Sequence, residues 1–233
     1  MILSAHQPQY IPWLGYFDKI DKSDCFVFLD TVQYKKREFQ NRNKIRTKTG
    51  SIWLTVPVRT KGASLQRLNE VQIDNEIDWQ KEHIHSLQTW YASAPHFSDY
   101  FPFFKTVYEK KWEKLIDLNI QIIKFILDAL KIKTEIYLES ELKTENVSTL
   151  RLIEICKKLD ADTYLSGRGG KDYLEESEFT KNNIKLQYQN FTHPEYLQQF
   201  ESEKHEFSAY MSVIDLLFNQ GPKSMDIIRA GKS

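Results

Sequence analysis

Residues 2–30 decide the fold, and they read ILSAHQPQYIPWLGYFDKIDKSDCFVFLD. Residues 2–5 form a short apolar run that ends at polar residues and prolines, and residues 25–29 form a second run that ends at Asp30. Short apolar runs bounded in this way are typical of buried strands. We therefore expect one strand on each side of this segment.

The segment between the two strands predicts a helix. Its apolar residues recur at helical spacing, namely Trp13, Leu14, Phe17 and Ile20. Pro12 stands near the start, and we expect Asp18, Lys19 and Lys22 to face away from the core. A strand, a helix and a strand in this order predict a parallel pair with a right-handed crossover, whose ligands bind beyond the carboxyl ends of the strands.

The rest of the chain extends this α/β pattern. Residues 44–46 and 53–58 flank a Thr49-Gly50 turn signal and predict a β-hairpin. Residues 78–131 have helical periodicity and predict a helical insertion. Three further strands are expected, at 135–138, 163–165 and 184–188. We therefore predict a single α/β domain over residues 1–233, with a mostly parallel five-stranded sheet.

The charge balance excludes a strong global field. The chain has 32 Lys and Arg against 32 Asp and Glu, so a dedicated nucleic-acid binder is unlikely. The N-terminus lacks the charged region and apolar run of a signal peptide, and no apolar stretch has the length of a membrane span. These features predict a cytoplasmic protein. Cys25 and Cys156 lie among apolar neighbours and are expected to be buried thiols.

The first candidate site is the polar loop directly after the first strand. It carries His6, Gln7, Gln9 and Tyr10, and Asp30 follows the second strand at the same expected edge. An imidazole there suits acid-base work near neutral pH or donation to a phosphate, and carboxamides both donate and accept hydrogen bonds. The alternative is that His6 only closes the loop by binding a backbone carbonyl.

The second candidate is a basic stretch, residues 33–48, in a chain that is otherwise neutral. Guanidinium groups there suit an anionic ligand, whereas a solvated basic loop is the alternative. The residues expected to bind substrate in it are Gln33, Lys36, Arg37, Gln40, Asn41, Arg42 and Arg46.

The third candidate is a glycine-rich turn after the strand at 163–165. Its glycines would let backbone N–H groups approach an anion, although the spacing matches no phosphate loop or dinucleotide fingerprint. The residues expected to bind substrate are Ser166, Gly167, Gly169, Gly170, Asp172 and Tyr173. His193, after the last strand, is a fourth contribution to the same edge or a satisfied loop histidine.

No metal centre is expected from the sequence. His83 and His85 would lie on opposite sides of a helix, so they do not share a metal ion. The chain also lacks the G-x-S-x-G elbow of serine hydrolases, which disfavours hydrolase chemistry.

Several motifs resemble the WbqC-like proteins of bacteria over essentially the whole chain. The opening segment 6–20, HQPQYIPWLGYFDKI, carries the resemblance first. It continues through Gln33, Lys36-Arg37 and residues 40–43, 53–58, 164–167 and 215–222.

This resemblance implies a companion of surface-polysaccharide and O-antigen genes, with a role in acylating an amino sugar, for example with glycine. The strand, His-containing turn and helix are also similar to nucleotidylyltransferases and pantothenate synthetase. That similarity implies a Rossmann-like, nucleotidylyltransferase-like fold and a nucleotide, ATP or a nucleotide-sugar, bound with Mg. In those enzymes a second His and a Gly follow the first His, and here Pro8, Gln9 and Tyr10 stand in their place.

Two functions from different classes remain. The first is a transferase acting on a phosphate-bearing or nucleotide-linked small molecule, with His6 as the catalytic residue and Arg37, Arg42 and Arg46 as an anion clamp. The second is a non-catalytic subunit that binds a glycan precursor or a partner enzyme. The expected partner is an anionic small molecule, and a homodimer is a further expectation.

Overall fold

The centre of the molecule is a five-stranded, all-parallel sheet. The computed structural model describes residues 1–59, 65–200 and 206–231. The strands lie in the order β5-β2-β1-β6-β7, so β1 occupies the middle. Their bounds are Ile2–His6 for β1, Cys25–Phe28 for β2, Glu135–Leu138 for β5, Thr163–Ser166 for β6 and Lys185–Tyr188 for β7. This is the order of doubly wound, Rossmann-like sheets, and it confirms the predicted α/β class.

Helices cover both faces of the sheet. α1 (Leu14–Asp21) and α4 (Leu115–Ala129) pack with Phe26 and Phe28 of β2 on one face. The alternate residues of β2 face a second apolar cluster, which includes side chains of α6 (Ser148–Lys158) and α7 (Glu176–Lys181). Each face therefore has its own core, as the twofold periodicity of a strand requires.

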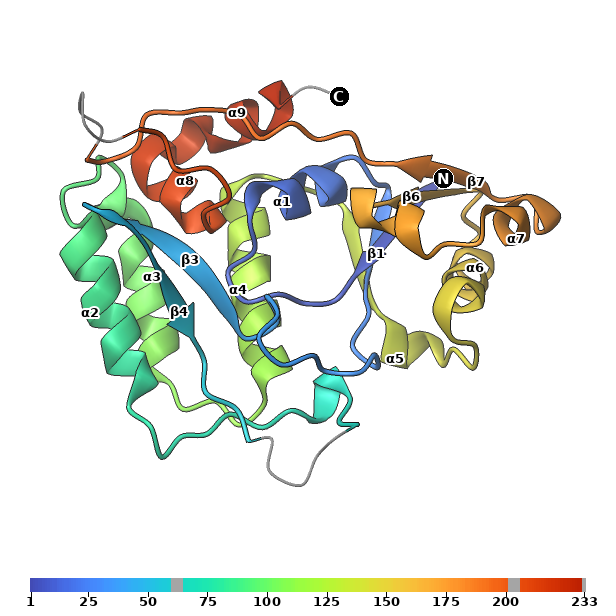
Figure 1. Cartoon of the computed structure of the whole chain (residues 1–233), viewed down its shortest axis with the longest axis horizontal. Coiled ribbons are helices and arrows are strands. Elements are labelled where there is room, and N and C mark those ends of the chain that lie inside the picture. The colour runs from blue at the N-terminus through green and yellow to red at the C-terminus, as the bar shows by residue number, and fades with distance from the viewer. Residues whose placement is uncertain (60–64, 201–205, 232–233) are drawn as a thin grey trace.

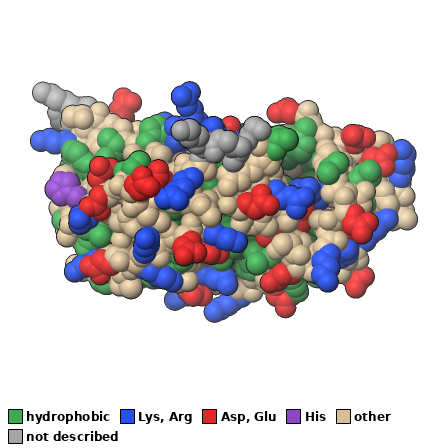
Figure 2. Space-filling view, turned by 90° about the horizontal axis from the view of Figure 1, so that it is seen from below, with side chains coloured by type: hydrophobic (Ala, Val, Ile, Leu, Met, Phe, Trp, Pro, Cys, Tyr) green, Lys and Arg blue, Asp and Glu red, His purple; other side chains and the backbone are tan. Residues whose placement is uncertain are grey.

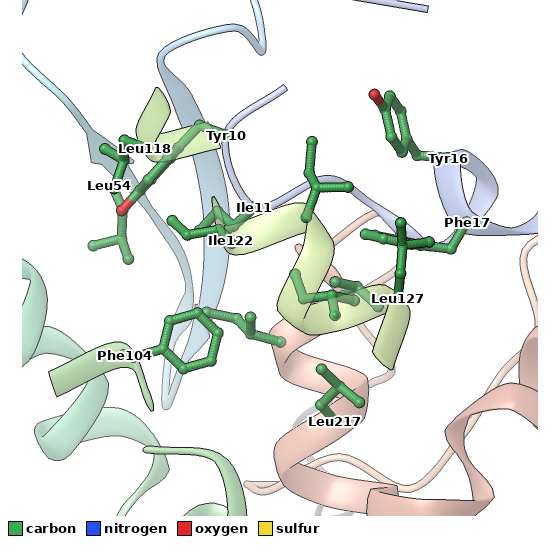
Figure 3. Packing of buried hydrophobic residues seen from close by; sticks show 14 of the residues in the cluster. Tyr10, Ile11, Tyr16, Phe17, Leu54, Phe104, Leu118, Ile122, Leu127 and Leu217 are labelled. Carbon is green, nitrogen blue, oxygen red and sulfur yellow. The ribbon is translucent and has the colours of Figure 1, made fainter. Parts of the chain in front are cut away.

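The predicted hairpin and helical insertion are both present. β3 (Arg42–Thr47) pairs antiparallel with β4 (Gly50–Thr55), and α2 (Trp79–Tyr91) and α3 (Phe97–Glu109) lie beside this hairpin (Figure 1). Figure 3 shows Phe104 of α3, Ile122 of α4 and Leu217 converging in one apolar cluster. The insertion is thus packed into the same core as α1.

Short helices complete the described structure. They are α5 (Glu139–Leu142), α8 (Val213–Gln220) and α9 (Ser224–Ala230), with 3-10 turns η1 (Leu68–Glu70), η2 (Arg168–Asp172) and η3 (Gly221–Lys223). α9 packs on the outer side of α1, where Arg229 forms an ion pair of 2.7 Å with Asp21.

This covering corrects one prediction about α1. Asp18 and Lys19 were expected to face solvent, but their exposed fractions are only 2% and 3%. The helix lies between β1 and the C-terminal segment, so apolar and polar faces alike are enclosed. The spacing of apolar residues predicts only the helix face that packs on the sheet. It does not predict that α9, near the other end of the chain, covers the opposite face.

A buried polar cluster joins the hairpin to α8. The Asp215 carboxylate, fully buried, accepts hydrogen bonds from the Tyr91 and Tyr196 hydroxyls at 2.7 and 2.8 Å. Gln198 donates to the same carboxylate and accepts from Arg46 of β3. Burial raises the pKa of Asp215, while these donors oppose the shift. The buried carboxyl group of Asp215 thus has hydrogen-bond donors on both of its oxygens.

The surface and the thiols agree with the sequence. Positive and negative side chains are interspersed on the face drawn in Figure 2. Within the described ranges, every helix is too short or too polar to cross a bilayer. Cys25 and Cys156 are free and buried, and burial raises the pKa of their thiols to about 11 and about 12.

Candidate functional site

The strand order places a topological switch point between β1 and β6. The chain leaves β1 for β2 on one side and returns through β6 on the other, so the loops after these two strands diverge. Ligands of open parallel sheets bind in the crevice that such divergence leaves at the carboxyl ends. His6 ends β1 and Ser166 ends β6.

Two cavities adjoin this point, and both are lined by His6. The first, here called the Arg151 cavity, has a volume of about 400 Å³. Its lining residues are Ala5, His6, Gln7, Leu29, Val32, Lys35, Ser148, Arg151, Leu152, Tyr164 and Tyr173. The second, here called the Lys19 cavity, measures about 230 Å³. Its lining residues are His6, Trp13, Gly15, Tyr16, Lys19, Gly167, Arg168, Gly169, Gln189 and Phe191.

The two cavities differ in chemistry. Aliphatic side chains and the Tyr164 and Tyr173 rings dominate the first, which suits a planar or aliphatic group. Its Arg151 is paired with the buried Glu139 carboxylate at 3.1 Å, whereas Lys35 is exposed at the rim. Two cations, Lys19 and Arg168, and no carboxylate line the second. The second cavity is therefore the more favourable of the two for an anion.

His6 is half-buried and neutral. Its Nδ1–H donates to the Gln7 carbonyl at 3.1 Å, which leaves the Nε2 lone pair free of any hydrogen bond among the described residues. The imidazole packs edge-on against the Tyr16 ring, with centroids 5.2 Å apart. Burial, and then the nearby charge of Lys19, lowers the pKa of His6 to about 3. In the free protein, His6 is an acceptor rather than a cation.

The loop after His6 is fixed by side chains from distant segments. Gln40 donates to the Gln7 side-chain oxygen at 2.6 Å, and Asn119 of α4 donates to the Pro8 carbonyl at 3.2 Å. Asn43 of β3 donates to the Ile11 carbonyl at 2.8 Å. Ile11 has a φ of 39°, an unfavourable angle for a β-branched residue, so these bonds hold a strained backbone in place.

Tyr10 belongs to this anchoring and not to the cavities. Its side chain is fully buried, and its hydroxyl bonds His83 of α2 at 2.7 Å and Tyr108 of α3 at 2.5 Å. Figure 3 shows its ring inside the apolar cluster. The structure thus gives Tyr10 a supporting position, whereas the sequence placed it on the substrate.

The glycine-rich turn lies across from His6. Gly167 and Gly169 line the Lys19 cavity, and Tyr173 lines the Arg151 cavity with 64% of its surface exposed. Ser166 is buried beneath the turn, and a Cβ on Gly170 would lie 2.0 Å from its Oγ. A larger residue at position 170 would therefore force the Ser166 side chain to move. Asp172 is exposed and lines neither cavity.

The basic stretch does not assemble as a clamp. The Arg46 guanidinium is buried against Gln198 and the Glu206 carbonyl, and Arg42 stacks 4.3 Å from the Trp53 ring centroid. Lys36 and Arg37 are exposed on the loop before β3. None of these four residues lines the Arg151 cavity or the Lys19 cavity, whose cationic lining residues are Lys35 and Arg151 in the first and Lys19 and Arg168 in the second.

The remaining predicted residues lie around the site. Asn41 donates to the Val56 carbonyl, and the exposed Gln33 forms a β-bridge with Arg67. Asp30 is buried, accepts from the Ser140 amide at 2.9 Å and lines a third cavity beyond β2 and β5. His193 stacks on the outer side of Trp13, with centroids 6.4 Å apart. Gln9 is half-buried, and its side-chain oxygen has no hydrogen-bond partner among the residues that the structure describes.

The described part of the chain contains no group of three or more His, Cys, Asp or Glu residues that could hold a metal ion.

The sequence analysis did not identify Lys19, the most unusual side chain of the site. The available signal was the position of Lys19 on a short helix, two residues after the aromatic pair Tyr16-Phe17. That position predicts an exposed lysine as readily as a buried one.

The comparisons with known proteins agree with the motifs. The model of the WbqC-like protein family matches residues 7–227. The uncharacterised protein Rv1507c of Mycobacterium tuberculosis is 34% identical over 225 residues, which cover 96% of this chain and 95% of that protein. No solved structure gives a significant match.

Proposed function

Because the chain belongs to the WbqC-like protein family, we propose that its two cavities bind the two substrates of a transferase. One substrate is a phosphate-bearing or nucleotide-linked small molecule. The observation that carries this proposal is the position of His6, a neutral imidazole shared by both cavities at the switch point of a parallel sheet. A group shared by two cavities is placed to act where their occupants meet.

The free Nε2 lone pair is the position at which His6 would take the proton that an acceptor loses, and this step requires that substrate binding raise the pKa of His6 from about 3. In acylation of an amino sugar, for example by a glycyl donor, the amine nitrogen forms a bond to the acyl carbon. The bond between the acyl carbon and the leaving group breaks, and the leaving group departs with its electron pair. The proton released by the nitrogen passes to Nε2 of His6, while Nδ1 stays bonded to the Gln7 carbonyl and fixes the ring. Tyr16 holds the same carbonyl through its hydroxyl at 3.1 Å, which keeps the acceptor of Nδ1–H in place.

The Arg151 cavity fits the base or sugar of a nucleotide better than its phosphates. Its walls are Leu29, Val32, Leu152 and two tyrosine rings, and its arginine is already paired with Glu139. A nucleotide bound there would direct its charged groups past His6 toward the cationic side of the site. The exposed ring of Tyr173 supplies a stacking surface at the entrance.

The test is a thermal-shift panel followed by turnover assays. Wild type, His6→Gln, Tyr173→Ala and the distant surface control Lys124→Met are compared with ATP, CTP, nucleotide-sugars, coenzyme A and amino acids, with and without magnesium. A ligand at a hundredfold excess over its dissociation constant adds about 2.7 kcal/mol, roughly 5 to 10 °C for a domain of this size.

The variants separate the two classes of function. A transferase loses turnover in His6→Gln while ligand shifts persist, and Tyr173→Ala weakens the shift of the nucleotide-linked substrate. A binding subunit would instead show ligand-induced thermal shifts in both wild type and His6→Gln. The wild-type protein would then form no product from any pair of the ligands that bind. A flat panel for all four proteins contradicts the proposal.

A further inference from the structure

Lys19 is a buried cation without an anion. Its side chain is 3% exposed, and its Nζ donates one hydrogen bond, to the Ala5 carbonyl at 3.0 Å. Among the described residues no carboxylate forms an ion pair with it, and the Phe26 ring lies 5.7 Å from the nitrogen. An ammonium has three donors, so this environment satisfies only part of its hydrogen-bonding capacity.

The charged groups around Lys19 are accounted for on every neighbouring element. On α1, one oxygen of Asp18 is paired with Lys22 at 3.0 Å and the other accepts from Gln189 at 2.6 Å. Asp21, on the far side of that helix, is bonded to Arg229. His6 of β1, Tyr16 of α1 and Arg168 of η2 line the Lys19 cavity and add no negative charge near neutral pH. The cavity is cationic with no internal counter-charge.

Its dimensions suit a small charged group. The volume of about 230 Å³ is too small for a whole nucleotide but large enough for a phosphate or carboxylate group with a few attached atoms. Arg168, which is exposed, donates to the neutral Asn190 side chain and forms no ion pair within the described ranges, so its charge is also uncompensated there. An anion between the two cations would receive charge-assisted hydrogen bonds from both sides.

We propose that the Lys19 cavity binds an anionic oxygen group, a phosphate or a carboxylate, of one of the two substrates, with the Lys19 ammonium as its principal donor. This inference rests on the proposed two-substrate function, and it locates the charged end of one substrate next to His6.

Binding there would act on His6 as well. Burial lowers the pKa of Lys19 to about 7, and the charge of Lys19 in turn contributes to the low pKa of His6. A bound anion stabilises the charged lysine and cancels its field at the imidazole. The same anion therefore removes the contribution of Lys19 to the low pKa of His6 and makes the imidazole a stronger base, while the larger effect of burial remains.

The test observes the lysine itself and needs no turnover. Protein labelled with ¹³C at the lysine side chains is titrated by NMR from pH 5 to 10, and the Lys19 ε-carbon signal is assigned by its loss in Lys19→Met. Three samples of equal ionic strength contain chloride, sulfate or acetate. Sulfate stands for a phosphoryl group and acetate for a carboxylate, and neither titrates above pH 6. Lys124, exposed on α4, is the internal control.

The expected result is a Lys19 midpoint near 7 in chloride that rises by one unit or more in sulfate, in acetate or in both. A rise of one unit corresponds to tenfold tighter anion binding to the charged form. The anion that causes the rise identifies the group, while Lys124 keeps its ordinary midpoint. Equal Lys19 midpoints in all three salts would overturn the proposal and leave Lys19 as an anchor of α1 to β1.

This outcome is independent of the ligand panel. An anion-dependent midpoint with a flat panel would keep the subsite and reject the proposed transferase. Active turnover with equal midpoints would keep the transferase and reject the subsite.

Discussion

Replacing Lys19 by methionine should make the protein more stable, by an amount that falls as the pH rises. The pKa of Lys19 is lowered from 10.5 to about 7 by burial. A group whose pKa is depressed on folding binds more protons in the unfolded chain, so its cost is largest at low pH and disappears above the unfolded pKa. Taking a folded pKa of about 7 and an unfolded pKa of about 10.4, the cost is about 4 kcal/mol at pH 7 and about 2 kcal/mol at pH 9.

The assay is urea unfolding of wild type and Lys19→Met at pH 7, 8 and 9. Methionine has nearly the same length and removes only the amine, so the core keeps its packing. Losing the hydrogen bond to the Ala5 carbonyl costs about 1 kcal/mol, but that loss is the same at every pH. The advantage of Lys19→Met should therefore shrink by about 2 kcal/mol between pH 7 and pH 9.

Other titrating groups are common to both proteins and cancel in the difference. The readout is thus the slope with pH and not the absolute stability. If the two stability curves run parallel across this range, Lys19 has an ordinary pKa in the folded protein, and the argument from its burial is refuted.

Two further predictions concern His6 and the glycine-rich turn. Because burial lowers the pKa of His6 to about 3, its imidazole should remain neutral and protonated on Nδ1 from pH 8 down to pH 5. ¹⁵N NMR of the ring measures this, and a titration midpoint near 6.5 would contradict it. Gly170→Ala should destabilise the protein by about 1 to 3 kcal/mol, since the new Cβ would lie 2.0 Å from Ser166 Oγ. In the double variant, Ser166→Gly should relieve most of that loss. If urea unfolding shows that the losses of the two single variants add, the clash is not the cause.

The fold was accessible from the sequence because its signals are local. The run at residues 25–28, the Thr49-Gly50 turn and the periodic stretch at 78–131 each specify an element through side chains close together in the chain. The parallel order then follows from the crossover rules, which need no knowledge of individual contacts. The five strands of the parallel sheet came out within one residue of the expected bounds, with His6 as the last residue of β1. The second hairpin strand, expected at residues 53–58, instead runs from Gly50 to Thr55, because the hairpin turn is tighter than the sequence indicated.

The candidate site was accessible only in part. His6 and Gly167 were predicted to lie at one edge because the carboxyl ends of adjacent parallel strands must meet, and both line the Lys19 cavity. The direction of a polar side chain on a covered helix or in a long loop depends on segments far away in the sequence. Lys19 is enclosed by such a cover, and Arg46 is drawn inward by Gln198. The burial of these two side chains cannot be predicted from the residues next to them in the sequence.

The polar loop after β1 has a consequence for the folding of this protein during its synthesis. Its first residues leave the ribosome early, yet Asn43 and Asn119 bond its backbone carbonyls and His83 and Tyr108 hold the side chain of Tyr10. Contacts spanning up to 111 residues have to form before the loop takes its final path. A nascent chain that ends before α4 therefore lacks Asn119, and the loop after β1 reaches its observed conformation only after the helical insertion has been synthesised and packed.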